Sequence, residues 1–215
     1  MNFKAVIFDL DGTLLDTLED IADSMNIVLR SFNFPKHDVA AYKYFIGNGL
    51  EALVARAIPE KLKDDSILQQ CIVAMREEYG KRWANKTRPY KGIPELLDSL
   101  ALRGIKMAIL SNKPDEFTKT TVANLLPHWQ FELVLGAKPS APKKPDPTTA
   151  KQMSKSLNIS PTEFLFLGDT AIDMETAKAA GMYPVGALWG FGPAHELSAG
   201  GAKLLIEKPG DFLEL

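Results

Sequence analysis

The chain has 215 residues, which is long enough for one sizeable core or for a core domain that carries a smaller inserted one. Its composition of 46% hydrophobic and 24% charged residues is typical of a globular protein and excludes a disordered or fibrous one. The formal charge of -2, without any block of like charges, gives no electrostatic reason to expect binding to nucleic acid or to an anionic membrane surface. A small molecule is therefore the expected partner.

The start of the chain and its cysteine content indicate a compartment. Cys71 is the only cysteine in the sequence, so no internal disulfide can form. The apolar first residues are interrupted by Asp9 and Asp11 before a signal-peptide core or a membrane span is complete. These features predict a cytoplasmic protein and leave its oligomeric state, monomer or dimer, open.

Short apolar segments rich in β-forming residues alternate with helical patterns over most of the chain, which implies parallel pairing. Runs such as residues 5–8 and 164–167 lack polar alternation, as strands covered by helices on both faces do. The sequence therefore predicts a doubly wound, Rossmann-like parallel α/β sheet. The expected strands are residues 4–8, 105–110, 131–135, 164–167, 185–188 and 203–206. The expected helices between them are residues 93–102, 114–125, 148–157 and 173–180.

The pattern changes between residues 16 and 86, where helical segments follow one another without a credible strand. We expect an all-helical cap at residues 16–86, inserted into an α/β core made of residues 1–15 and 87–215. Ligand crevices of open parallel sheets lie at the carboxyl ends of the strands, so an insert that follows the first strand is expected to act as a lid. Its expected helices are residues 18–31, 39–45, 50–57 and 67–84.

Two acids stand directly after the first expected strand, in the sequence Asp9-Leu10-Asp11-Gly12-Thr13. In extended backbone, residues i and i+2 point to the same side, so both carboxylates are expected to face one site. Keeping both ionised requires a metal cation or a positive side chain, and oxygen-rich clusters suit magnesium. Gly12 permits a tight turn and Thr13 offers a hydroxyl where a phosphate comes close. The alternative is a strand-end turn with solvated acids.

A second pair of acids follows another expected strand, at Asp169 and Asp173. If a helix begins there, both carboxylates share a face and are directed to the same metal. Either acid alone would be an ordinary helix cap. The repetition of acids at two strand ends favours a metal site.

Three further polar residues carry weaker signals. Ser111, with Asn112 beside it, follows the expected strand at 105–110 and can donate a hydrogen bond to a phosphoryl oxygen, although both residue types are common in turns. Lys144 stands in a proline-rich loop and can neutralise the charge that develops on a transferring phosphoryl group.

Taken in order, these motifs resemble those of haloacid dehalogenase superfamily phosphatases with a helical cap inserted after the first strand. The matching positions are Asp9 to Thr13, Ser111, Lys144-Pro145, and Gly168-Asp169 with Asp173. The resemblance spans essentially the whole chain, and an ordered set on the expected strand ends is more specific than any one motif.

The resemblance implies a mechanism in which Asp9 attacks phosphorus and forms a phosphoaspartate, while Asp11 serves as acid and then as base. It also implies Mg²⁺ held by Asp9, the Leu10 carbonyl and Asp169, with Asp173 in support and Asp11 among the metal-site acids. Lys144 and Ser111 would secure the transferring group, and Thr13 and Asn112 would contact the substrate. Because Asp11 is present, the resemblance favours phosphate ester chemistry over dehalogenation.

Within these phosphatases, the chain looks most like phosphoglycolate phosphatases, on the segments Asp16 to Ile21, Gly47-Asn48-Gly49, Asp169 to Gly181 and Gly190-Phe191-Gly192. The substrate expected from this resemblance is 2-phosphoglycolate. A pyrophosphatase, a nucleotidase and a sugar-phosphate mutase of the same family are alternatives. The mutase is disfavoured because such enzymes are expected to carry a histidine soon after the first motif, whereas the first histidine here is His37. A non-catalytic binding protein with this fold is the alternative from another class.

Gly47, Asn48 and Gly49 lie between two expected cap helices. Their backbone donors could meet a substrate carboxylate or sugar, so we predict substrate contacts there, with an ordinary helix-to-helix turn as the alternative.

Overall fold

The computed structural model describes residues 3–139 and 141–214. The chain forms two compact units, a core unit of Met1–Asp16 with Pro89–Leu215 and an insert of Thr17–Arg88. The assignment of a catalytic domain at residues 1–15 and 87–215 and a cap at 16–86 stays a prediction. Each unit is described by itself below.

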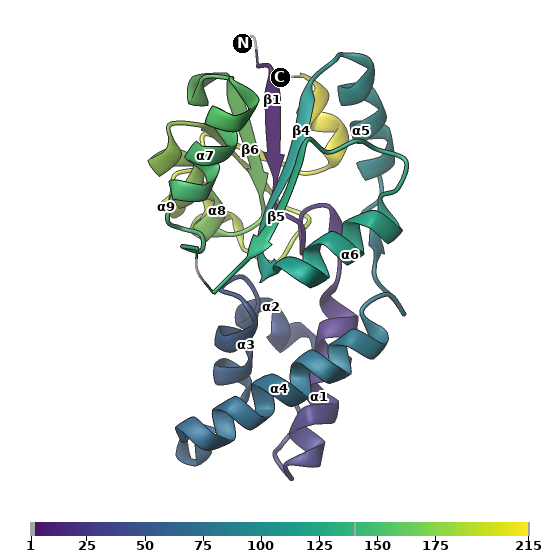
Figure 1. Cartoon of the computed structure of the whole chain (residues 1–215), viewed down its shortest axis with the longest axis vertical. Helices are drawn as coiled ribbons and strands as arrows, with labels where there is room; N and C mark the ends of the chain where they lie inside the picture. The colour runs from purple at the N-terminus through teal and green to yellow at the C-terminus, as the bar shows by residue number, and fades with distance from the viewer. Residues whose placement is uncertain (1–2, 140, 215) are drawn as a thin grey trace. The chain divides into compact units, whose positions relative to one another are not determined.

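The core unit contains a six-stranded parallel sheet with the strand order β5-β4-β1-β6-β7-β8 (Figure 1). The predicted doubly wound sheet is thus confirmed. Its strands are β1 (Ala5–Phe8), β4 (Lys106–Pro114), β5 (Leu133–Ala137), β6 (Phe164–Gly168), β7 (Tyr183–Ala187) and β8 (Leu204–Ile206). A separate pair of two-residue strands, β2 (Leu15–Asp16) and β3 (Arg88–Pro89), lies where the chain leaves and re-enters the core.

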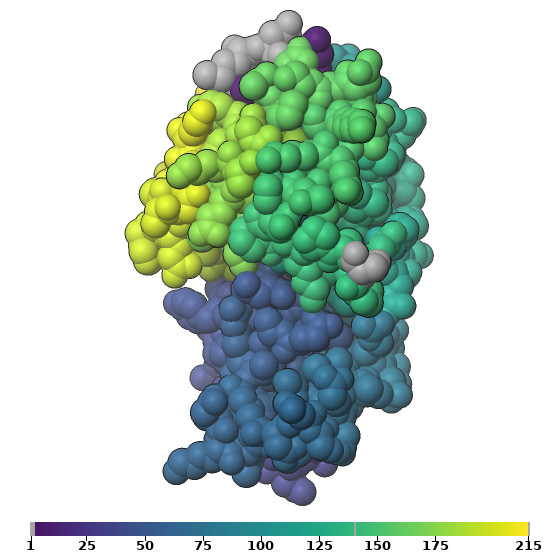
Figure 2. Space-filling view, turned by 60° about the vertical axis from the view of Figure 1, so that its left-hand side comes forward, coloured from purple at the N-terminus to yellow at the C-terminus, as the bar shows by residue number. Residues whose placement is uncertain are grey.

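Helices cover both faces of the sheet, so strand residues are buried without polar alternation. Val6 and Phe8 of β1 point into one apolar cluster, whereas Ala5 and Ile7 point into another. The first cluster receives α5 (Ile93–Leu102) and α6 (Asp115–Leu125), and the second receives α7 (Thr148–Leu157) and α8 (Ala171–Ala180). Figure 2 shows this cover from one side, where the purple of the chain start is visible only as a small patch. A further helix, α9 (Ala194–Gly200), follows β7.

Two of the predicted boundaries that were wrong lie at strand ends that carry polar residues. Strand β4 continues through Ser111 and Asn112 to Pro114, four residues beyond the expected end at 110. Helix α8 begins at Ala171, because Thr170 forms a reciprocal capping box with Asp173. In both cases buried polar residues are accommodated in regular structure by partners that hydrophobic patterning does not reveal.

The insert is helical, as predicted. Its α-helices are α1 (Leu18–Ser31), α2 (Tyr42–Phe45), α3 (Leu50–Ala57) and α4 (Asp65–Arg82), with 3-10 turns at Val39–Ala41 and Glu60–Leu62. The single helix predicted at residues 39–45 was therefore wrong in its first half. Helix α4 starts two residues earlier than predicted, since the Asp64 side chain accepts a hydrogen bond from the backbone N–H of Ile67. Apolar residues from its helices, including Met25, Tyr42, Val54 and Met75, form its own buried core.

None of the helices in the described residues has the length and apolar character needed to cross a membrane.

Candidate active site

The register of the sheet brings the three predicted motifs to one edge. Phe8, the last residue of β1, is level with Ile109 in β4 and Leu167 in β6. Because these strands are parallel, Asp9, Ser111 and Asp169 all emerge at the carboxyl edge within two residues of that level. Positions more than 150 residues apart in the sequence therefore meet as a direct consequence of parallel pairing.

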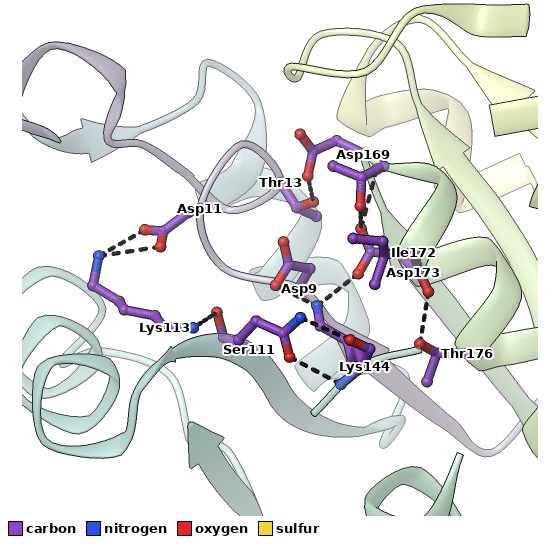
Figure 3. Close-up of polar contacts among 12 residues, drawn as sticks. Asp9, Asp11, Thr13, Ser111, Lys113, Lys144, Asp169, Ile172, Asp173 and Thr176 are labelled. Atoms are coloured by element: carbon purple, nitrogen blue, oxygen red, sulfur yellow. Dashed lines mark hydrogen bonds and ion pairs between the residues drawn. The ribbon is translucent and has the colours of Figure 1, made fainter. Parts of the chain in front are cut away.

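Three buried carboxylates gather at this edge. Asp9, Asp169 and Asp173 each offer an oxygen, and these oxygens lie within 4.8 Å of one another. The ammonium of Lys144 lies between two of them and donates to Asp9 Oδ1 at 2.7 Å and to Asp173 Oδ1 at 2.6 Å (Figure 3). Its side chain is only 3% exposed, so this cation is part of the interior and is not a solvated loop residue.

The electrostatics of the cluster show an excess of negative charge. Burial, opposed by Lys144 and reinforced by Asp173, raises the pKa of Asp9 from 3.8 to about 7. Burial together with the charges of Asp9 and Asp173 raises the pKa of Asp169 well above its usual range. Burial alone would lower the pKa of Lys144, but pairing with Asp173 and Asp9 outweighs it and raises that pKa. One ammonium is therefore insufficient to hold the pKa of Asp9 and of Asp169 in the usual range of a carboxylate.

Asp169 is fixed through both of its carboxylate oxygens. The Thr13 hydroxyl donates to Oδ1 at 2.8 Å, and the backbone N–H of Phe191 donates to Oδ2 at 2.8 Å. Gly12, at φ +91°, and Gly190 pass so close that a Cβ atom on either would overlap the Asp169 carboxylate. The turn after β1 and the loop after β7 thus enclose this one side chain.

Asp173 makes two kinds of contact at once, one as a helix cap and one within the acid cluster. Its Oδ2 accepts hydrogen bonds from the Thr170 backbone at 3.0 Å and the Thr170 hydroxyl at 2.7 Å, which is the capping role. Its Oδ1 accepts from Lys144. Helix α8 therefore begins with an acid that also belongs to the cluster.

Asn112 orients the loop that carries Lys144. Its amide donates to the Lys144 carbonyl at 3.0 Å, and its Oδ1 accepts from the Lys144 backbone N–H at 2.9 Å. Both ends of the Asn112 amide thus hold the backbone of Lys144, and the Thr13 hydroxyl holds Asp169. The substrate contacts predicted for these two residues stay predictions.

Asp11 lies outside the carboxylate cluster. Its two oxygens accept from the ammonium of Lys113 at 2.8 and 3.2 Å (Figure 3), and the Lys113 side chain is only 4% exposed. The backbone N–H of Lys113 donates to the Ser111 hydroxyl oxygen at 3.2 Å. The carboxylate of Asp11 is thus held by a lysine and not by the other acids, and its predicted place among the metal ligands stays a prediction.

Sequence reasoning missed Lys113. A lysine after Ser-Asn resembles an ordinary turn residue, and the only available signal was a third polar residue directly after an apolar strand. The backbone carbonyl of Leu10 accepts three N–H groups of the turn, from Thr13, Leu14 and Leu15, and so is engaged within the chain. Its expected contact with a metal stays a prediction.

The residues present fit a hard divalent cation. The cluster offers only carboxylate oxygens, which are the ligands that such cations prefer. The cluster sets three carboxylates against the one ammonium of Lys144, so a dication would balance it. The same cation would also lower the pKa of Asp9 from its raised value and so keep that carboxylate ionised near neutral pH.

Gly47, Asn48 and Gly49 lie in the insert, where they lead into α3. Gly47 and Gly49 have φ values of +112° and +91°, and the Arg56 guanidinium donates to Asn48 Oδ1 at 2.8 Å. This geometry is that of a tight turn between helices. The substrate contacts predicted for these residues stay a prediction.

Comparison with known proteins identifies the family. Residues 6–187 match the family model for haloacid dehalogenase-like hydrolases. The chain belongs to this family. The phosphoglycolate phosphatase of Aquifex aeolicus is 31% identical over 212 residues, which is 99% of this chain and 96% of the relative. The phosphoglycolate phosphatase of Haemophilus influenzae is 33% identical over 195 residues, or 88% of this chain and 87% of the relative.

A solved structure agrees with the curated relatives. The crystal structure of a predicted phosphoglycolate phosphatase from Haemophilus somnus superimposes with a TM-score of 0.92 at 26% identity, covering 100% of this chain and 98% of that one. The resemblance drawn from the motifs is therefore confirmed. This haloacid dehalogenase-like hydrolase is similar to phosphoglycolate phosphatases along almost its whole length.

Proposed function

We propose that this family member hydrolyses a small phosphomonoester in a Mg²⁺-dependent reaction that passes through a phosphoryl group carried on Asp9. The observation that supports the proposal most directly is the position of Asp9. Its carboxylate stands at the carboxyl edge of the sheet, inside an acid cluster, with one oxygen fixed by Lys144. The ion pair sets the orientation of the carboxylate, and nucleophilic attack needs only the other oxygen.

The first step forms a bond between an Asp9 oxygen and phosphorus and breaks the bond to the ester oxygen. Asp9, Asp169 and Asp173 would hold the Mg²⁺ ion, which supplies charge neutralisation for the phosphoryl oxygens when bound. Lys144 supplies a second positive charge from a fixed position. Ser111, at the neighbouring strand end, supplies a hydroxyl for a phosphoryl oxygen.

Asp11 would move the protons. As the ester bond breaks, it gives a proton to the departing oxygen. In the second step it takes a proton from the water that attacks the phosphoryl group on Asp9, and this attack releases inorganic phosphate and restores both acids. Asp11 therefore has to enter the first step protonated, and its location outside the metal-ligating cluster suits this role, because a dication bound to the carboxylate would hold it ionised.

2-Phosphoglycolate is the proposed substrate, because the curated relatives that match nearly the whole chain are phosphoglycolate phosphatases. At about 30% identity, the hydrolysis of pyrophosphate or of a nucleotide on the same site, and sugar-phosphate transfer, remain outcomes to be tested. Specificity is expected to reside in the insert, including Gly47, Asn48 and Gly49.

The proposal is tested by measuring phosphate release from a panel of phosphomonoesters, pyrophosphate and nucleotides, with Mg²⁺ and with EDTA. We expect the highest kcat/KM on 2-phosphoglycolate and loss of turnover with EDTA. Asp9→Asn should lower kcat by about 10⁴-fold or more, since it removes the nucleophile. Mass spectrometry of acid-quenched protein should find the phosphoryl group on a peptide that contains Asp9.

Asp98→Asn is the matched control, because Asp98 is an exposed acid on α5 of the same unit. It should leave turnover unchanged. Full turnover by Asp9→Asn would remove Asp9 from its role. Wild-type protein that released phosphate from none of the compounds would favour a binding protein over an enzyme.

A further inference from the structure

Lys113 is a buried cation that the proposed chemistry does not yet use. Its ammonium contacts both oxygens of Asp11, at 2.8 and 3.2 Å, and the side chains of Lys113 and Asp11 are 4% and 11% exposed. An ion pair in such surroundings is held more tightly than one on the surface, because water has little access to either partner. Among the described residues, the acids that could share a metal ion are Asp9, Asp169 and Asp173, and Asp11 is not one of them.

The backbone of Lys113 is fixed on both sides. Its N–H donates to the Ser111 hydroxyl oxygen at 3.2 Å, and its carbonyl accepts from the Thr118 hydroxyl at 3.1 Å. Lys113 lies near the end of β4, in an irregular stretch between Leu110 and Pro114, which both pair with β5. The ammonium is thus presented from a strand end whose backbone is held by these pairs and hydrogen bonds, whereas Asp11 lies in the turn after β1. A cation held in this way sets the direction of the acid that it binds.

We propose that Lys113 is a positioning residue for the reaction, whose ammonium holds the Asp11 carboxylate apart from Asp9, Asp169 and Asp173 and directs it toward the leaving-group oxygen. The inference rests on the proposed function, because it assigns Lys113 a role through the acid–base residue of that reaction. Without the lysine, the Asp11 carboxylate would be available to the cation of the acid cluster. An acid drawn to that cation would no longer meet the departing oxygen.

The effect of losing Lys113 on kcat/KM depends on the leaving group of the substrate. An alkyl alkoxide needs a proton as it departs, whereas p-nitrophenolate leaves without one. In this double-displacement reaction kcat/KM reports the steps up to phosphorylation of Asp9. A residue that positions the acid therefore affects kcat/KM for an alkyl ester much more than for p-nitrophenyl phosphate, whereas a residue that contacts the phosphoryl group or maintains the fold affects both equally.

The experiment compares Lys113→Met with wild type on 2-phosphoglycolate and on p-nitrophenyl phosphate. We expect kcat/KM to fall by about 10²-fold on the alkyl ester and by no more than about fivefold on the aryl ester. Lys113→Arg, which keeps the charge, should recover most of the alkyl activity. Lys106→Met is the matched control, since Lys106 is an exposed lysine at the start of the same strand, and both activities should be unchanged.

A double variant tests whether the lysine acts through Asp11. In the Asp11→Asn background, Lys113→Met should cause no further loss, because the acid that it positions is already absent. This double variant leaves no unpaired charge, so it also serves if Lys113→Met alone fails to fold. Equal losses on both esters, or losses that multiply in the double variant, would overturn the inference. Wild-type protein inactive on both esters would overturn the proposed function itself, and this inference with it.

Discussion

The molecule contains two sites with a buried carboxylate, and the groups that surround the buried charge differ between them. In the insert, Asp20 is 1% exposed and accepts hydrogen bonds from the backbone N–H groups of Lys86 and Thr87 and from the Thr87 hydroxyl, at 2.7 to 3.1 Å. In the core unit, Asp9 is 7% exposed and has one lysine and two further acids around it. One carboxylate is surrounded by donors and the other by like charges.

This difference indicates that Asp20 stabilises the fold, whereas Asp9 belongs to a site for binding or catalysis. The contacts of Asp20 join α1 to the end of the insert sequence, more than 60 residues away, so this acid fastens the two ends of the insert together. The cluster around Asp9 has the opposite character, because it concentrates charge that the protein itself does not neutralise. Such arrangements are costly to stability and are typical of sites that bind a cation or carry out chemistry.

The largest expected effect is on the free energy of unfolding, which should depend on pH because of the crowded acids around Asp9. The pKa of Asp9 is raised to about 7 in the folded chain from 3.8, so between these values the native state binds a proton that the unfolded state has released. With metal chelated, the free energy of unfolding should therefore fall as pH rises from about 4 to about 7, by about 4 kcal/mol at most. Asp9→Asn should remove most of this decline, because the amide does not ionise.

Urea denaturation in EDTA at about pH 4 and about pH 8 measures this effect, with Asp98→Asn as the control that keeps the full decline. Adding Mg²⁺ to wild-type protein at the higher pH should restore stability, by about 2.7 kcal/mol at a concentration of 100 times its Kd. A wild-type stability that did not change with pH in EDTA would show that the acids are not crowded, and the contrast with Asp20 would disappear.

A smaller effect is expected from Asp20, and on stability alone. Asp20→Ala leaves three buried donors of Lys86 and Thr87 without their acceptor, which should lower the free energy of unfolding by about 3 kcal/mol. Asp23→Ala is the matched control on the same helix, because Asp23 is 43% exposed and pairs with Lys86 at the surface. Its effect should stay within about 0.5 kcal/mol. Added Mg²⁺ should stabilise both variants as much as wild type, unlike Asp9→Asn.

Asp9 and Asp20 also differ in how far their surroundings could be predicted from the sequence. The convergence of Asp9 with Asp169 followed from strand alternation and parallel pairing, since acids at the ends of neighbouring parallel strands must meet at one edge. The burial of Asp20 had no comparable signal. Its partners, Lys86 and Thr87, are ordinary residue types, and only the folded insert brings them to α1.

Within the core site, the motif acids could be predicted from the sequence, whereas the contacts of the side chains that fix them in place could not. Thr13, Asn112 and Lys113 were seen as turn or substrate residues, or were missed, because patterning identifies polar residues near a strand end but not what they contact. Gly190 is a clearer case. Its importance comes from the Asp169 side chain beside it, more than 20 residues earlier, and nothing in a Gly-Phe-Gly sequence specifies that neighbour.

The smallest expected effect is that of a substitution at Gly190. It tests whether the core acids must be held as tightly as their contacts indicate. A Cβ on Gly190 would overlap the Cβ and Oδ2 atoms of Asp169, so Gly190→Ala should displace this carboxylate from the position that Thr13 and Phe191 define. We expect the affinity for Mg²⁺ to fall by about 10-fold to 100-fold, as when the supports of metal ligands are altered. Isothermal titration with Mg²⁺ measures the change directly.

Gly210→Ala is the control, because a Cβ at Gly210 meets no atom within 4 Å. It should leave the Mg²⁺ affinity unchanged. If Gly190→Ala also bound Mg²⁺ as wild type does, the tight enclosure of Asp169 would serve packing alone. The core acids would then resemble Asp20 more closely than their charges suggest, since both sites would use their contacts for stability and only the excess charge would distinguish them.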